Sequence, residues 1–225
     1  SEDSLIVFRA DDADDFCAGG DTTVENLYIN AIGSDPVVLT CITEITGSLE
    51  IENSITVSID LSNVSAIGDE LNIHDNDTLE SVDLSGLTSI GGYVQIQSNS
   101  DLSSVNLSEL LVVDEYFNVT SNSSLESVTL SNFTEVGEHF NFNSNSNLET
   151  IEMPDLTDVG SGFYVNSNSN LETIQLPSFV ELGNELNIES NYALEEISMP
   201  MLEETGGNFY IQRHDSLRSI DASSL

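Results

Sequence analysis

A repeat runs through most of this chain, and its constant period of 23 constrains the fold more than any other feature. Six copies align without gaps, and the first reads LESVDLSGLTSIGGYVQIQSNSD from Leu79. A degenerate copy starts at Thr56, and an incomplete one runs from Leu217 to Leu225. No copy this short can bury a hydrophobic side alone, so the copies must stack around one continuous core.

Apolar residues alternate with polar ones at two places in each copy. In the copy from Leu79 these pairs are Val82 with Leu84 and Val94 with Ile96. Such alternation predicts short strands, and helical periodicity is absent. We therefore expect an all-β fold, a right-handed β-solenoid whose 23-residue coils lie roughly 4.8 Å apart and turn by loops.

A glycine precedes the second pair of apolar residues in nearly every copy, and Asp114 is the one exception. Glycine and aspartate suit turns that need a positive φ angle, so this column predicts the corners of the coils. The column consists of Gly68, Gly91, Gly137, Gly160, Gly183 and Gly206.

The two ends of the chain depart from the repeat. We expect a single solenoid domain over residues 1–225, with an N-terminal cap at 1–40 and about seven to eight coils at 41–225. Cys17 and Cys41 both lie near the start, and one disulfide between them would pin the cap to the first coil, with two buried thiols as the alternative. Because the last copy stops at its ninth position, we expect more protein to follow Leu225.

The charge balance excludes some partners. The chain has 40 acidic residues, three arginines and no lysine, which gives a formal charge of -37. Nucleic acid and anionic membranes require clustered basic residues and are not expected as partners. An acidic coat suits a saline or extracellular setting, and no stretch of 18 apolar residues is present to insert into a membrane.

The repeat resembles receptor L-domains, which are related to leucine-rich repeats. The segment CITEITGSLEIENS at 41–54 resembles the opening of an L-domain, and later copies follow L-x-x-I-x-L-P-x-L-x-x-V-G-x-x-F-x-I-x-S-N. This pattern is similar to fungal GPI-anchored cell-wall L-domain proteins and to bacterial BspA-type surface repeats. BspA-type repeats carry an Ala-Phe pair after the glycine, which is replaced here by x-x-F-x-I, so the L-domain likeness is favoured. The resemblance covers 41–225 and implies a secreted or cell-surface protein, but no binding residue carries over.

An asparagine column is the most regular polar feature, and we expect it on the surface. Stacked asparagines at a solenoid corner can hydrogen-bond from coil to coil and cap turns, with ligand contact as the alternative. The column comprises Asn76, Asn99, Asn122, Asn145, Asn168 and Asn191, with His214 in the last place.

Acidic residues also stack from coil to coil. Neighbouring carboxylates at strand spacing repel by roughly 1 kcal/mol in water, so splayed side chains, salt or divalent cations must relieve them. In one of these acidic columns Arg218 follows Glu195 and can neutralise it. Calcium is the one candidate cofactor, because carboxylate oxygens suit that ion. No D-x-D-x-D-G loop for calcium occurs in the sequence. Its candidate ligands are Glu126, Glu149, Glu172 and Glu195, and a second acidic run comprises Glu135, Asp158, Glu181 and Glu204.

Polar side chains lie between the core residues of the second strand and should face outward. Amides with a few tyrosines suit a carbohydrate or protein partner, and they suit any solvated sheet as well. The candidate ligand-binding residues are Asn72, Gln95, Asn118, Asn141, Tyr164, Asn187 and Tyr210.

Catalysis is not expected. The histidines, His74, His139 and His214, fall in different columns about three coils apart, so they cannot share a metal or a triad. No lysine or arginine base lies between Arg9 and Arg213, although hydrolysis by paired carboxylates stays open. The favoured function is a non-catalytic extracellular or cell-surface adhesion module that binds a glycan or a protein. A structural spacer with cation-binding acidic columns is the alternative, and a carbohydrate-active enzyme is the third.

Overall fold

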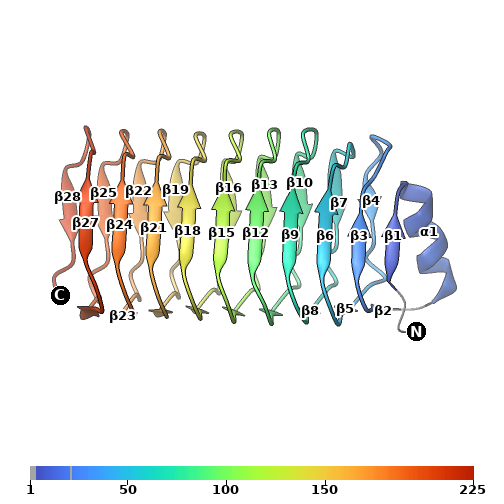
Figure 1. The fold of residues 1–225 in the computed structure, drawn as a ribbon, viewed down its shortest axis with the longest axis horizontal. Helices are drawn as coiled ribbons and strands as arrows, with labels where there is room; N and C mark the ends of the chain where they lie inside the picture. The colour runs from blue at the N-terminus through green and yellow to red at the C-terminus, as the bar shows by residue number, and fades with distance from the viewer. Residues whose placement is uncertain (1–3, 21) are drawn as a thin grey trace.

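A computed structural model describes residues 4–20 and 22–225 as a stack of β-coils (Figure 1). The largest sheet has ten parallel strands, one from each successive coil, and is called sheet A here. Its strands are β1 (Leu5–Val7), β3 (Leu27–Ile29), β6 (Leu49–Glu52), β9 (Leu71–His74), β12 (Val94–Gln97), β15 (Phe117–Thr120), β18 (Phe140–Asn143), β21 (Phe163–Asn166), β24 (Leu186–Glu189) and β27 (Phe209–Gln212).

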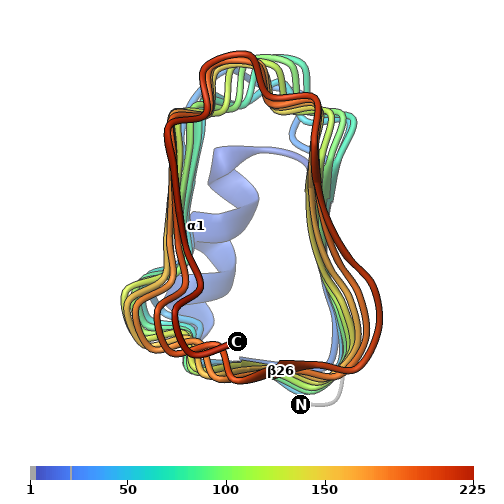
Figure 2. The ribbon, with the colours of Figure 1, turned by 90° about the vertical axis from the view of Figure 1, so that its left-hand side faces the viewer.

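Three further parallel sheets complete the coils. Viewed along the axis of the stack, each coil has two long walls that face each other, and sheet B forms one of the short sides between them (Figure 2). Sheet B has the strands β2 (Thr23–Val24), β5 (Glu44–Ile45), β8 (Ala66–Ile67), β11 (Ser89–Ile90), β14 (Val112–Val113), β17 (Glu135–Val136), β20 (Asp158–Val159), β23 (Glu181–Leu182) and β26 (Glu204–Thr205). Sheet C has β4 (Val37–Val38), β7 (Ser58–Asp60), β10 (Ser81–Asp83), β13 (Ser104–Asn106) and β16 (Ser127–Thr129). Sheet D has β19 (Thr150–Glu152), β22 (Thr173–Gln175), β25 (Glu196–Ser198) and β28 (Ser219–Asp221).

The strand register confirms the all-β solenoid and its period. Val94 pairs with Phe117, which pairs with Phe140, and equivalent residues of these coils have a sequence separation of 23. Leu27, Leu49 and Leu71 are partners in the first coils, where the separation is 22. Each regular coil contributes three strands, one to sheet A, one to sheet B and one to sheet C or D, where the repeat predicts at least two.

Alternating side chains fill one core, as the sequence predicts. In β12, Val94 and Ile96 are fully buried, whereas Gln95 and Gln97 face outward. The rings of Phe117, Phe140 and Phe163 stack from coil to coil with centroids 5.5 and 5.0 Å apart. Full burial of such a side chain contributes roughly 1.5–3 kcal/mol, so the core column stabilises contact between neighbouring coils.

The N-terminal cap contains a helix that the sequence reading missed. Helix α1 (Ala10–Gly19) lies across the N-terminal end of the stack (Figures 1 and 2). Asp12 accepts hydrogen bonds from the backbone N–H groups of Phe8 and Arg9, and Gly20 ends the helix with a φ angle of 83°. Acidic residues favour a helix N-terminus, and Asp11 and Asp12 lie in the first turn of α1.

The predicted disulfide between Cys17 and Cys41 is present and ties α1 to the first turns of the solenoid. In the described part of the chain, no helix is long and apolar enough to cross a membrane.

The φ angles at the corners of the coils show that the prediction for the glycine column was wrong. Among the described glycines only Gly20 has a positive φ angle, so the column glycines serve another purpose. A Cβ atom at Gly160 would collide with the backbone oxygen of Gly137, and the other column members are similarly tight. Close coil contact therefore selects glycine here. The positive φ angles fall instead at Asn53, Asp75, Ser98, Ser121, Ser144, Ser167, Ser190 and Arg213.

The asparagine column is buried, which corrects its expected place on the surface, while the hydrogen-bonded ladder is confirmed. Asn99 donates from Nδ2 to the backbone oxygen of Ile73, 3.0 Å away in the preceding coil. Its Oδ1 accepts the backbone N–H of Asn76 at 3.2 Å. The same pattern recurs up the stack, starts at Ser54 and ends at His214, whose two ring nitrogens contact the backbone oxygens of Asn191 and Ile188. These amides are structural, and a ligand cannot reach them.

Candidate functional site

The seven candidate ligand-binding residues share one outward row on sheet A. Strand pairing sets Gln95, Asn118, Asn141 and Tyr164 side by side. Asn72 precedes them, and Asn187 and Tyr210 continue the row. All of them point away from the core, as the sequence predicts, and each lies between two core residues of its strand.

Four strands of sheet A present a surface without charge, which we call the central amide face. Its members are the outward residues of β12, β15, β18 and β21. The strands on either side are different, since β9 carries His74 and β24 carries Glu189. Beyond β9, β6 carries Glu50 and Glu52. The central amide face comprises Gln95, Gln97, Asn118, Thr120, Asn141, Asn143, Tyr164 and Asn166.

An aromatic row borders the central amide face. Tyr93, Tyr116 and His139 occupy the position before three successive strands, and their rings stack with centroids 4.6 and 5.1 Å apart. The next coil has Gly162 at this position, and the ring of Tyr164 covers the space that a side chain would fill. Tyr164 meets His139 edge to face at 6.4 Å, so the row spans four coils.

The chemistry of the aromatic row is that of hydroxyl groups and ring edges. Stacking covers the ring faces of Tyr116 on both sides, so those faces are not open to a ligand. Burial, the neighbouring Tyr93 and the carboxylates of Glu115, Glu138 and Glu70 raise the pKa of Tyr116. The phenol therefore stays protonated near neutral pH and keeps its O–H donor.

The carboxylate columns lie away from this face. Arg218 Nη1 contacts Glu195 Oε2 at 2.9 Å, which confirms the predicted neutralisation. Among the described residues, the carboxylate oxygens of Glu126, Glu149 and Glu172 do not all lie within 4.8 Å of one another. Calcium binding at this column stays a prediction. The second acidic run pairs strand to strand in sheet B, where Glu135, Asp158 and Glu181 line a shallow depression of about 360 Å³.

One cluster of potential metal ligands escaped the sequence reading. Donor atoms of Glu50, Glu52 and His74 all lie within 4.8 Å of one another. His74 lies in a different column from the other histidines, and the two glutamates are its neighbours instead. Glu52 and His74 are register partners 22 residues apart, so a strict 23-residue alignment sets His74 beside Ile51 instead.

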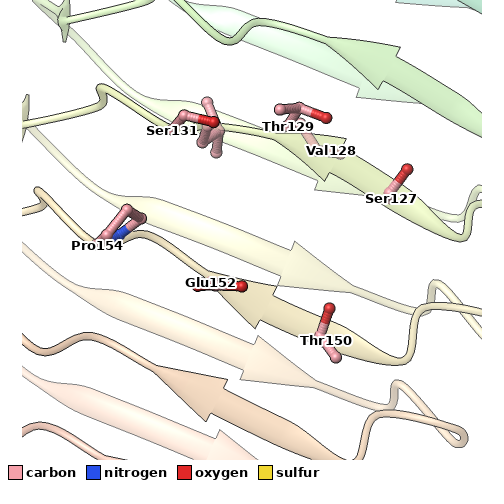
Figure 3. A pocket seen from close by; sticks show the side chains of 8 residues that line it. Ser127, Val128, Thr129, Ser131, Thr150, Glu152 and Pro154 are labelled. Atoms are coloured by element: carbon pink, nitrogen blue, oxygen red, sulfur yellow. The ribbon is translucent and has the colours of Figure 1, made fainter.

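A cleft interrupts the wall formed by sheets C and D. It lies between β16 and β19, has a volume of about 250 Å³, and is lined by Ser127, Thr129, Ser131, Thr150 and Glu152 among others (Figure 3). Glu152 is the one carboxylate among its lining residues, so the cleft offers no acid pair for hydrolysis.

The cleft exists because two adjacent coils fail to pair on this wall. Leu107 N–H donates to Thr129 O at 3.0 Å, and Met153 N–H donates to Gln175 O at 3.1 Å. In residues 127–154, all of which are described, Leu130 N–H has no corresponding bond to Glu152. Sheets A and B remain continuous through the same coils, so only one wall opens.

A large core residue explains the opening. Phe142 pairs with Val119 and Val165, whose side chains are much smaller. Its ring lies against Phe140, with centroids 4.8 Å apart, and it lines a small separate cavity together with Val128 and Leu130, which also line the cleft. We attribute the separation of β16 from β19 to this extra volume, because a close-packed core cannot absorb it without moving a wall.

Hydrogen exchange tests the open wall directly. The backbone N–H of Leu130 is expected to exchange at least about tenfold faster than that of Leu107 or Met153, because it lacks their ladder bond. Residue-resolved exchange by NMR measures this, and equal protection at the three positions would show that β16 and β19 are paired in solution. A Phe142→Ile variant should slow exchange at Leu130 by letting the two strands approach.

No protein-family model, curated protein or solved structure matches this chain. The chemistry of its surfaces therefore carries the functional argument. What the geometry establishes is a parallel β-solenoid of stacked coils, compatible with a leucine-rich-repeat or L-domain-like repeat fold, with one disulfide and an uncharged strip on sheet A.

Proposed function

We propose that this protein is a non-catalytic, extracellular or cell-surface recognition module whose central amide face binds a neutral glycan. The observation that carries the proposal is the absence of charge from the eight outward positions of β12, β15, β18 and β21, in a chain of 40 acidic residues. Amide and hydroxyl groups lose little on desolvation when they bond sugar hydroxyls, whereas carboxylates lose more. Because the coils repeat, these groups would recur at a regular distance along the face, as the sugar units do along a polysaccharide.

Neighbouring features narrow the class of ligand. The aromatic row adds phenol O–H donors along one border. Acidic residues on β24, and on β6 beyond β9, would repel a polyanionic glycan. A protein partner is less well supported, because protein interfaces are richer in apolar and aromatic contacts than this face. The L-domain-like architecture and the disulfide are compatible with a cell-surface adhesion role.

Glycan binding by amide variants tests the proposal. An Asn118→Ala/Asn141→Ala double variant is expected to bind its neutral glycan at least about tenfold more weakly, since each lost hydrogen bond contributes roughly 1 kcal/mol. Gln175→Ala, an outward amide on the opposite wall, is the matched control and should bind normally. Binding would be measured on a broad glycan panel, with calcium and again with chelator.

Each outcome of that panel is informative. Retention of a neutral glycan that the double variant loses supports the central amide face. Retention that both variants keep would place the site elsewhere, and no retention in either buffer would overturn glycan recognition. The acidic depression on sheet B favours a structural spacer as the second candidate, for which calcium would raise the melting temperature without any glycan binding.

A further inference from the structure

Three side chains on two neighbouring strands, β6 and β9, converge in the N-terminal half of sheet A. Glu50 and Glu52 occupy alternate positions on β6 and therefore share its outward side. His74 on β9 is the register partner of Glu52. Two ligands at alternate positions of one strand and a third on the adjacent strand bring three donors to one point on a sheet surface.

From this convergence we propose that Glu50, Glu52 and His74 form a binding site for a divalent transition-metal ion, with Zn²⁺ as the best fit. His74 Nε2 lies 3.3 Å from Glu50 Oε1. Two ligand atoms bound at about 2.0 Å to one tetrahedral Zn²⁺ are themselves about 3.3 Å apart. A donor atom of Glu52 lies within 4.8 Å of both, and this partly exposed side chain would have to rotate to bind the ion.

The second nitrogen of His74 is held by a carboxylate. Nδ1 lies 3.1 Å from Asp75 Oδ2, and this arrangement fixes the ring so that Nε2 faces the two glutamates. Metal-bound histidines generally donate their other N–H to such a partner, which orients the ring and raises its basicity. The site has the outer support that a metal-binding histidine requires.

The residues involved differ from those at the same positions in the next four coils. The positions equivalent to His74 in the next four coils carry Gln97, Thr120, Asn143 and Asn166, which are uncharged. The following column is serine in those coils but aspartate at Asp75. Solenoid packing alone does not require a histidine with three carboxylates on an outward surface.

The donor set selects the class of ion. Calcium takes six to eight oxygen ligands, which an imidazole and two carboxylates do not supply. One nitrogen and two oxygens suit Zn²⁺, with water completing the coordination. His74 is largely covered, with 18% of its side chain exposed, so the ion would bind at a partly enclosed point.

Isothermal titration of the whole chain with Zn²⁺, in physiological salt and excess Mg²⁺ to occupy general carboxylates, tests the site. One tight site is expected. His74→Ala should weaken it about 100-fold and Asp75→Asn about tenfold, whereas His139→Ala should leave it unchanged. His139 is the matched control because it lies on the same side of the solenoid in the aromatic row.

A spectroscopic readout locates the metal independently of affinity. In ¹⁵N NMR of the imidazoles, Zn²⁺ should shift His74 Nε2 while Nδ1 stays protonated and His139 stays unaffected. A tight site that survives His74→Ala, the lack of any tight site, or Ca²⁺ binding as tightly as Zn²⁺ at His74 would each overturn the proposal. None of these results depends on glycan binding, so the two proposals can fail separately.

Discussion

Asn145→Ala is expected to lower the free energy of unfolding by about 3 kcal/mol, because two buried polar groups lose their partner. The side chain bridges coils, since Nδ2 donates to Val119 O at 2.9 Å and Oδ1 accepts Asn122 N–H at 3.1 Å. All of these groups lie in the fully buried asparagine ladder. Alanine would leave a buried donor and a buried acceptor unpaired, and each such loss costs roughly 1–3 kcal/mol. Urea unfolding followed by circular dichroism measures the change.

Two further variants sharpen that experiment. Asn147→Ala, at an exposed position in the next turn, should stay within about 0.5 kcal/mol of wild type. Asn145→Asp keeps an acceptor but loses both donors and adds a buried charge, so it should destabilise at neutral pH and less in acid. If Asn145→Ala matched Asn147→Ala, the ladder would not stabilise the stack.

Removal of the disulfide should cost a similar amount. Cys17 and Cys41 close a loop with a sequence separation of 24, and constraining such a loop in the unfolded chain is worth about 3 kcal/mol. A Cys17→Ala/Cys41→Ala variant is therefore expected to unfold at lower denaturant concentration than the wild type. Because contacts in a solenoid run between neighbours, the loss should begin at the cap.

Reduction of the wild-type protein supplies the control. A reducing agent should lower its stability to that of the double variant and should leave the double variant unchanged. Limited proteolysis should then cut first near α1. A wild type whose unfolding midpoint does not respond to reduction would show that the cap is held by packing alone, through residues such as Ala13 and Phe16.

The two cysteines near the start of the chain predicted the disulfide. The repeat predicted the all-β solenoid, the alternation of core and outward residues and the contact between Arg218 and Glu195. These features follow from local pattern, because a strand with period 2 has only one way to bury its apolar side. Residue spacing also placed Asn72, Gln95, Asn118 and the rest of their row outward. Their role in binding stays a prediction.

Several features depended on contacts that no single coil reveals. The glycine column suggested positive φ angles, but Gly160 is small because the neighbouring coil lies against it, and the strained backbone falls at Ser144 and its equivalents. The asparagine column was placed on the surface, although polar side chains with enough partners can be buried. Helix α1 escaped because its signals, Asp12 and Gly20, are local caps in a short segment.

The sequence by itself determined the period, the strands and the strongly acidic surface of this protein, because those depend on which residues recur and at what spacing. Only the tertiary structure decided where columns from different coils meet. It brought His74 to Glu50 and Glu52, stacked Tyr93 on Tyr116, and opened the wall beside Phe142. These outcomes depend on which side chains face each other across neighbouring coils and on how much volume each fills, because stacking brings together residues that are far apart in the chain.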